Sequence, residues 1–213
     1  MIFDKPKPMK LAITPRFFEN EVEQLIGIEK KYYPFFKNFG HHIHMIPFMG
    51  IKLIKYFEDL NPDAVVFAGG YRLYTDEINK FETEVLKEAL NRKLPILAIC
   101  CGMWTINSYF NGTLKFDESH QAFDGEKIDT KKWIHSVEAT DFIKQKTYDV
   151  NSCHSKIIDR LGDDLNKFLI TEDGSIEGIY NLEKRIIGIQ FHMENKGVSS
   201  SLTRQLMKKF EEL

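Results

Sequence analysis

Cysteine is scarce in this sequence, with three residues among 213, and two of the three are adjacent. Cys100, Cys101 and Cys153 cannot form a disulfide framework, so we expect reduced thiols. Cys101 and Cys153 are most simply interpreted as small, half-buried residues. The scarcity argues against the class of small proteins that are held together by disulfides.

Long apolar runs and an excess of one charge are also missing. No segment is long and apolar enough to span a bilayer. The net charge of -2 comes without the dense Lys/Arg patch that indicates nucleic-acid binding. Residues 1–9 lack the apolar core of a signal peptide, and we expect them to be a ragged leader to a single domain over 10–213. We therefore expect a cytoplasmic protein with no nucleic-acid and no membrane partner.

The first half of the chain alternates apolar strand-like segments with amphipathic helix-like segments. Strands are predicted at 10–14, 42–46, 64–67 and 96–99, and helices at 51–60 and 77–92. A further helix is predicted over 21–39, with Pro34 as an interruption, Gly40 as its end and apolar positions at Val22, Leu25, Ile26, Tyr33, Phe36 and Phe39. This alternation predicts an α/β fold, in which helices cover both faces of a mostly parallel sheet.

The second half changes to short β-like segments. They lie at 134–138, 148–151, 168–171, 176–180 and 186–190, and they predict a small antiparallel extension. Residues 115–132 are polar and without period, which is compatible with a loop or a lid. Residues 199–213 are expected to form an amphipathic helix capped by Ser199 or Ser200, with Leu202, Leu206 and Phe210 buried.

Residues 95–112 predict a nucleophile elbow. A buried strand over 96–99 leads through Cys100 directly into a helix that begins with Gly102 and Met103. Such a turn needs small residues two positions before and after its tip, and Ala98 and Gly102 meet this need around Cys100. A thiol at the amino end of a helix is placed where the dipole favours the thiolate. We therefore predict that Cys100 is the nucleophile.

A base and an orienting carboxylate follow the last predicted strand. His192 and Glu194 lie just past 186–190, and residues two apart in an extended chain point the same way. The imidazole can then serve the thiol while the carboxylate orients it. The backbone amides of Cys101 and of Gly70, in the Gly69-Gly70 turn, are the predicted donors to a tetrahedral oxyanion.

Seven short motifs, in this order, resemble the signatures of class I glutamine amidotransferase-like enzymes, and most of all the branch of free-standing γ-glutamyl hydrolases. They are Ala-Gly-Gly at 68–70, Ala-Ile-Cys-Cys-Gly-Met at 98–103, Asn-Gly-Thr-Leu at 111–114, His-Ser-Val at 135–137, Val-Asn-Ser-Cys-His-Ser at 150–155, Gly-Ser-Ile-Glu-Gly-Ile at 174–179 and Gly-Ile-Gln-Phe-His-Met-Glu at 188–194. The resemblance spans roughly residues 10–210, and the motifs carry it jointly, through their order.

The resemblance implies a flavodoxin-like fold and a division of roles in the site. Cys100 is the implied nucleophile, His192 the general base and later acid, and Glu194 the orienter, while Gly70 and Cys101 supply the oxyanion amides. The residues implied to line the glutamyl pocket are Gly69, Trp104, His135, Ser136, Val137, Ser152 and His154. No metal or organic cofactor is implied.

Three positions depart from the family pattern. Trp104 stands where the family commonly has Gln, Met193 stands where Pro is usual, and Cys101 replaces an Arg found in many relatives. Trp104 removes a hydrogen-bonding amide and adds an aromatic wall. These changes bear on the substrate rather than on the reaction type.

The sequence supports one main hypothesis and two alternatives. The first is hydrolysis of the γ-glutamyl amide bond of a small molecule through a γ-glutamyl thioester, with release of glutamate and an amine. The alternatives are a glutaminase subunit that delivers ammonia to a separate synthetase, and a catalytically degenerate binding module. The amine half of the substrate and the oligomeric state are left open, and a homodimer is compatible with the sequence.

Overall fold

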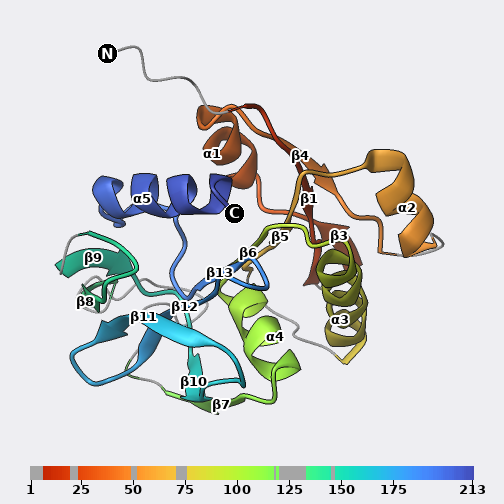
Figure 1. Ribbon diagram of the computed structural model, residues 1–213. Helices are drawn as coiled ribbons and strands as arrows, with labels where there is room; N and C mark the ends of the chain where they lie inside the picture. Colours follow the sequence, from red (N-terminus) through yellow and green to blue (C-terminus); the bar gives the residue numbers. More distant parts are fainter. Residues whose placement is uncertain are drawn as a thin grey trace, which may run out of the picture.

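A nine-stranded sheet runs through the centre of the molecule (Figure 1). The computed structural model describes residues 7–19, 24–48, 52–70, 76–117, 119, 133–144 and 147–213. Within these residues the strand order is β4-β1-β5-β6-β13-β12-β11-β8-β9. Non-consecutive neighbours in this order mean that helices cross over the sheet between strands.

Five neighbouring strands form the parallel half of the sheet. They are β4 (His42–Met45), β1 (Lys10–Ile13), β5 (Ala64–Phe67), β6 (Ile96–Ile99) and β13 (Ile186–Ile189). Strands β5, β6 and β13 are buried at every residue, which explains why their sequences are continuous apolar runs. Their carboxyl ends meet at one edge, where the turns after β5, β6 and β13 lie next to one another.

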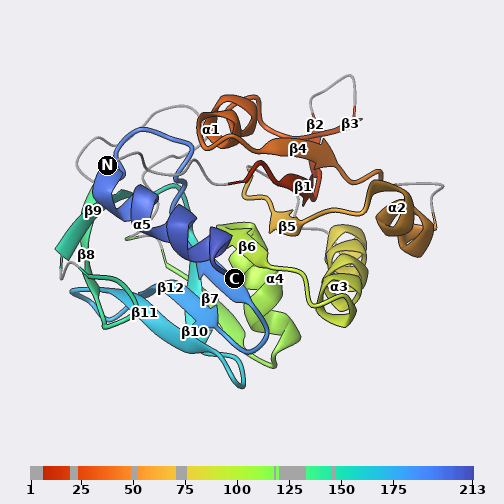
Figure 2. The same cartoon turned by 45° about the horizontal axis from the view of Figure 1, so that its top comes forward.

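Helices cover both faces of the parallel half (Figures 1 and 2). Helices α1 (Tyr32–Asn38) and α5 (Ser200–Glu211) lie on one face, and α2 (Leu53–Leu60), α3 (Asp76–Asn91) and α4 (Cys101–Tyr109) lie on the other. The predicted stripe of α5 is confirmed, because Leu202, Leu206 and Phe210 are fully buried. Ser199 is the N-cap residue of α5, although its side chain makes no capping bond.

Four antiparallel strands extend the same sheet. They are β12 (Ile176–Asn181), β11 (Asn166–Thr171), β8 (Ile134–Ala139) and β9 (Thr147–Asn151). The predicted α/β class and the antiparallel extension are confirmed, and the extension is continuous with the main sheet. A separate antiparallel ribbon, β7 (Thr113–Phe116) with β10 (Lys156–Arg160), was not predicted. The predicted loop at 115–132 begins inside β7, and its residues 118 and 120–132 lie outside the described residues.

The prediction of one long helix over 21–39 is wrong. Residues 16–27 include a hairpin of β2 (Arg16–Glu19) and β3 (Gln24–Gly27), and α1 begins only at Tyr32. Pro34 lies in the first turn of α1, where its missing N–H costs no helix bond, so it causes no interruption. Tyr32 is fully buried while Tyr33 is exposed. The predicted apolar position Val22 lies outside the described residues.

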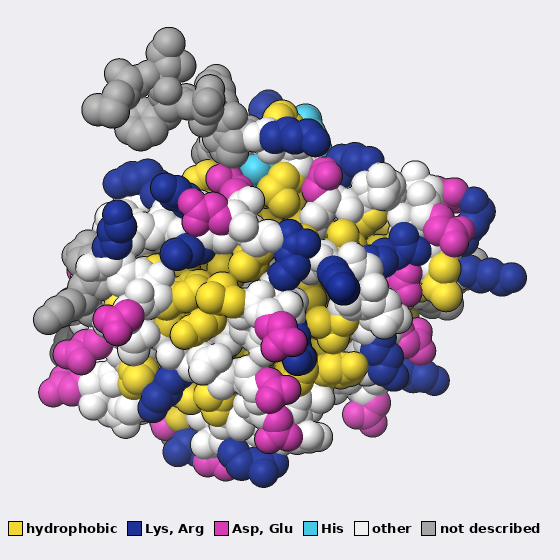
Figure 3. Space-filling model, in the orientation of Figure 1, with side chains coloured by type: hydrophobic (Ala, Val, Ile, Leu, Met, Phe, Trp, Pro, Cys, Tyr) yellow, Lys and Arg dark blue, Asp and Glu magenta, His cyan; other side chains and the backbone are white. Residues whose placement is uncertain are grey.

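On the face shown in Figure 3, Lys and Arg side chains are interspersed with Asp and Glu. In the described part of the chain, none of the helices combines the length and the apolar character that a membrane crossing requires.

A buried ion pair between β2 and α3, with its hydrogen bonds, connects the end of β1 and α4 to the turn after β5. Arg16 Nη1 donates to Glu82 Oε1 at 2.6 Å, and Arg16 Nη2 donates to the carbonyl of Ala68. Thr14 and Thr105 donate their hydroxyl protons to Glu82 at 2.9 and 2.6 Å. Because Glu82 is wholly buried, these donors replace the water that its carboxylate loses on folding.

We expect Glu82→Ala to lower the free energy of unfolding by about 3 kcal/mol, because it leaves the guanidinium of Arg16 buried without its partner. Denaturant unfolding measures the change. Glu84→Ala removes an exposed carboxylate from the same helix and is the matched control. An equal loss in the two variants would contradict the structural role of the buried pair.

Candidate active site

The turn between β6 and α4 places Cys100 at the carboxyl edge of the parallel strands. Cys100 has φ 51° and ψ -111°, a strained backbone conformation for a residue with a side chain. A Cβ on Gly102 would lie 2.6 Å from the Cβ of Phe67 and closer still to the Phe67 carbonyl oxygen, so the turn requires glycine there. The predicted strand, sharp turn and helix are confirmed.

His192 and Glu194 form a short hydrogen bond beside this turn. The Nδ1 atom of His192 lies 2.6 Å from Oε1 of Glu194, and the Glu194 side chain is fully buried. The two residues meet in a turn rather than in an extended chain, since β13 ends at Ile189 and the amide of Asn195 donates to the His192 carbonyl at 3.1 Å. This bond closes the turn around Met193 without the proline that is usual in the family.

Asn151, at the end of β9, fixes the backbone of His192. Its Oδ1 accepts from the His192 amide at 3.0 Å, and its Nδ2 donates to the His192 carbonyl at 2.8 Å. Both bonds are buried. The loop that carries the imidazole is therefore held against the end of β9 through both backbone polar groups of His192.

Gly69 marks the point at which His192 and Cys100 come together. A Cβ on Gly69 would lie 2.6 Å from Cε1 of His192 and 3.0 Å from Cβ of Cys100. The ring of His192 and the side chain of Cys100 thus border the same small space, with the Gly69 backbone as its floor. Only glycine leaves this space open.

The protonation of the two groups is set by burial and by their neighbours. The hydrogen bond with Cys101, and then burial, raise the pKa of Cys100 well above its ordinary value, so the effect of the helix end expected from the sequence is outweighed. Burial lowers the pKa of His192, but the charge of Glu194 and its hydrogen bond outweigh burial and raise it. A resting thiol beside an imidazole of increased basicity is an arrangement suited to general-base activation.

The two predicted oxyanion donors lie on neighbouring turns. The Cys101 thiol donates to the Gly70 carbonyl at 3.4 Å, which places the start of α4 against the turn after β5. The amide of Gly69 donates to the Tyr32 hydroxyl at 2.8 Å. Burial raises the pKa of Tyr32 well above its ordinary value, so this hydroxyl stays neutral. Tyr32 was not predicted as a site residue, because it fell inside the longer helix predicted over 21–39.

The residues predicted to line the glutamyl pocket do not all lie together. Ser136 is exposed and donates to Asp149 at 3.0 Å, whereas Val137 is fully buried in the core. Ser152 is buried, and its amide donates to the carbonyl of Trp133 at 2.9 Å. His135 and His154 both contact Glu177, a residue that was not predicted to belong to the site.

Glu177 lies between the two histidines in a buried cluster. Its carboxylate oxygens are 3.3 Å from Nε2 of His154 and 3.7 Å from Nε2 of His135. Burial would raise the pKa of Glu177, but the charge of His154, followed by hydrogen bonding with His135 and His154, outweighs burial and lowers the pKa to about 2. Within the residues that the structure describes, no group of three or more His, Cys, Asp or Glu is arranged to hold a metal ion.

Trp104, the predicted aromatic wall, is bound to another polar side chain. Its indole Nε1 donates to Oε1 of Gln190 at 2.8 Å, and the residue is only 6% exposed. Gln190 lies in the motif that carries His192 and Glu194, which is the signal by which it could have been found. A contact across 86 residues is not visible from spacing alone.

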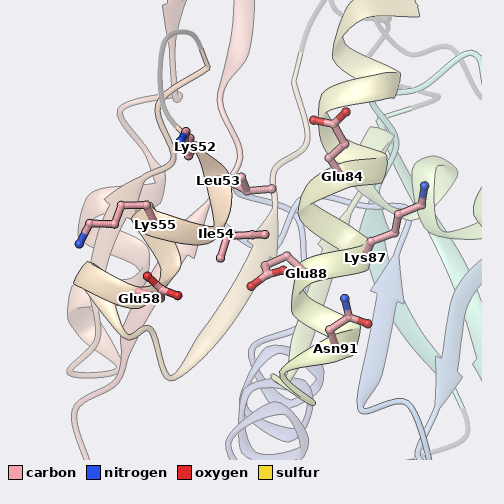
Figure 4. Close-up of a pocket in the computed structure, with 9 residues that line it drawn as sticks. All are labelled: Lys52, Leu53, Ile54, Lys55, Glu58, Glu84, Lys87, Glu88 and Asn91. Carbon is pink, nitrogen blue, oxygen red and sulfur yellow. The ribbon is translucent and has the colours of Figure 1, made fainter.

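A pocket of about 590 Å³ lies between α2 and α3, away from these residues (Figure 4). Leu53 and Ile54 point from α2 toward Glu88 on α3. The residues that line the pocket are Lys52, Leu53, Ile54, Lys55, Glu58, Glu84, Lys87, Glu88 and Asn91. None of the predicted site residues is among them, so the pocket is not part of the candidate active site.

The arrangement of sheet and helices matches solved structures of one fold class. The crystal structure of a "putative gmp synthase subunit a protein" from Thermoplasma acidophilum superposes with a TM-score of 0.71 and 18% sequence identity, over 97% of this chain and 94% of that chain. This likeness establishes the fold, an α/β arrangement around a large, mostly parallel sheet, as the sequence predicted.

Family membership follows from the sequence comparisons. The Peptidase C26 model matches residues 59–194, which is more than half of the chain, and the chain belongs to that family. The "Putative glutamine amidotransferase-like protein YvdE" of Lactococcus lactis is 30% identical over 182 residues, 75% of this chain and 77% of that protein. The γ-glutamyl-CDP-amidate hydrolase of Campylobacter jejuni is 27% identical over 154 residues, 69% of this chain and 68% of that protein. The prediction of a hydrolase is confirmed at the level of the family.

We expect stability at acid pH to depend on Glu177. Because the folded protein lowers its pKa to about 2, the charged carboxylate stabilises the fold above the ordinary value of 4.5, and this contribution is lost as the pH falls from 4.5 toward 2. Glu177→Gln should therefore flatten the fall in unfolding free energy between pH 5 and pH 2.5 by on the order of 2 kcal/mol. Glu138→Gln, an exposed change on β8, is the control. Parallel pH profiles for the wild type and Glu177→Gln would contradict the expectation.

Proposed function

We propose that the chain hydrolyses the γ-glutamyl amide bond of a small molecule and releases glutamate and an amine. The observation that carries the proposal is the joint position of three side chains in a member of the Peptidase C26 family. Cys100 stands on a strained elbow, and His192, bound to Glu194 at 2.6 Å, borders the same space above Gly69. A nucleophile, a base and an orienting carboxylate are the parts that acyl transfer requires.

The first half of the reaction forms a thioester. Because Nδ1 of His192 faces Glu194, the other ring nitrogen, Nε2, is the atom that takes the proton of the Cys100 thiol. The sulfur attacks the amide carbonyl carbon, and the negative charge that develops on the carbonyl oxygen faces the backbone amides of Gly70 and Cys101. When the C–N bond breaks, His192 gives its proton to the departing amine.

The second half releases glutamate. Water, deprotonated by His192, attacks the thioester carbonyl, and the C–S bond breaks to return the thiol of Cys100. Glu194 keeps its hydrogen bond with His192 and stabilises the imidazolium that forms in each half. No cofactor takes part in this scheme.

The amine half is the open part of the proposal. The Campylobacter relative is named as a hydrolase of a γ-glutamyl nucleotide amidate, which makes that class one of the substrates to be tested. γ-Glutamylated amines, glutathione and other γ-glutamyl peptides are the others. We propose further that residues 10–213 act as one domain and need no synthetase partner for hydrolysis.

The direct test is glutamate release from a panel of these amides, with free glutamine included. We expect at least one amide to be cleaved faster than glutamine, and Cys100→Ala to lower kcat/KM by at least about a thousandfold, because no thioester can form. Release at the wild-type rate by Cys100→Ala would contradict the proposal. Hydrolysis of glutamine alone, and only after addition of a synthetase, would favour a glutaminase subunit instead.

Gly69→Ala tests the space between base and nucleophile. Its new Cβ would lie 2.6 Å from the His192 ring, so we expect the imidazole to move and kcat to fall by roughly a hundredfold. Gly27→Ala is the matched control, since its new Cβ would meet only Phe18, at an ordinary 3.7 Å. If both variants keep the wild-type kcat, His192 does not act from the position described.

A further inference from the structure

Gln190 connects Trp104 with the proposed nucleophile. The residue follows β13 directly and is fully buried. At one end of its amide, Oε1 accepts the indole N–H of Trp104 at 2.8 Å. At the other end, Nε2 donates to Sγ of Cys100 at 3.7 Å, a length suited to the larger sulfur atom. Its backbone amide donates to the Glu177 carbonyl at 2.9 Å, so the residue is held from both its main chain and its side chain.

The indole decides which end of the amide faces the sulfur. An amide side chain can accept through its oxygen or donate through its nitrogen, and the two ends have nearly the same shape. An indole N–H can only donate. The oxygen of Gln190 must therefore face Trp104, which turns the two amide N–H bonds toward Cys100.

The N–H donor of Gln190 has its main effect when the sulfur of Cys100 is charged. The interior around Cys100 disfavours a negative charge, and the titratable side chains near it in the described part of the chain include Cys101, Cys153 and His192. A hydrogen bond to an ionised group is stronger than one to a neutral group, so the N–H of Gln190 favours the thiolate over the thiol. The thiolate is the form that attacks.

We propose that Gln190 is a positioning residue that, with its amide oxygen held by Trp104, directs an N–H donor at Cys100 and stabilises the attacking thiolate. The role rests on the proposed function, because it assumes that Cys100 is the nucleophile. Trp104 then acts through Gln190, not through contact with the substrate. This assigns a purpose to the tryptophan at a position where relatives commonly carry glutamine.

The test measures the reactivity of Cys100 without any substrate. Iodoacetamide alkylation is followed over pH, and fragment-ion mass spectrometry assigns the label to Cys100 or Cys101. In Gln190→Met we expect the pH of half-maximal Cys100 alkylation to rise by about one unit, because the thiolate loses a donor. Gln205→Met is the matched control, since Gln205 Nε2 donates to the Tyr148 hydroxyl at 3.0 Å, away from the site.

A second variant at the same position shows whether a shift comes from the lost donor or from misfolding. Gln190→Glu keeps an acceptor for the Trp104 indole, loses the donor and places a carboxylate near the sulfur, so its alkylation midpoint should rise further than that of Gln190→Met. Trp104→Phe frees the amide to turn and should raise the midpoint by roughly half a unit. Adding Trp104→Phe to Gln190→Met should produce no further shift, because both changes remove the same donor.

Several outcomes would overturn the role. In the first, the alkylation midpoints of Gln190→Met and Gln190→Glu equal those of the wild type and Gln205→Met. In the second, the midpoint shifts of Trp104→Phe and Gln190→Met add fully in the double variant. The proposed function is judged separately. Shifted midpoints in a protein that cleaves no γ-glutamyl amide would contradict the function alone, and unshifted midpoints in an active enzyme would contradict the role of Gln190 alone. In an active enzyme, kcat of Gln190→Met should fall at neutral pH while KM changes little.

Discussion

The lack of space where β5 and β6 end governs the rest of the site. Helix α4 can start directly after β6 only because Gly102 has no side chain to meet Phe67, and the turn forces Cys100 into a backbone conformation with positive φ. Such strain costs about 1–3 kcal/mol and persists where the surroundings hold it. Here β6 is buried at every residue and paired on both sides, so the strand cannot shift to relieve it.

Three buried carboxylates are held by basic side chains, two of them by partners that are distant in the sequence and one by a near neighbour. Glu82 is bound by Arg16, Glu177 lies between His135 and His154, and Glu194 is bound by His192. A buried carboxylate without a partner would take up a proton or destabilise the fold. The first pair fixes the turn after β5, and the third is available for chemistry. The site therefore combines one charge network that serves the fold with another that serves the proposed reaction.

Predictions from the sequence were right where the apolar pattern of a segment was continuous, and they failed where that pattern was interrupted or misleading. Strands 64–67 and 96–99 were predictable because strands buried on both faces must be apolar throughout. Strand β3 was mistaken for part of a helix because Leu25 and Ile26 stand at helical spacing from Tyr33 of α1, although both are exposed. Strands β7 and β10 escaped prediction because most of the residues of β7 are exposed and polar residues interrupt both strands. For the site, the turn around Cys100 and the pair of His192 and Glu194 were predictable from short motifs.

The sequence alone determined the order of the motifs, the turn with Cys100 at its tip and the family to which they belong, because each depends on residues only a few positions apart. The tertiary structure decided which distant side chains meet. Gln190 is 90 residues from Cys100 and 86 from Trp104, and Tyr32 is 37 from Gly69. Spacing along the chain carries no information about such contacts, since they arise when strands β6 and β13 pair and α1 packs on the sheet. The surroundings of the thiol are for that reason a property of the fold.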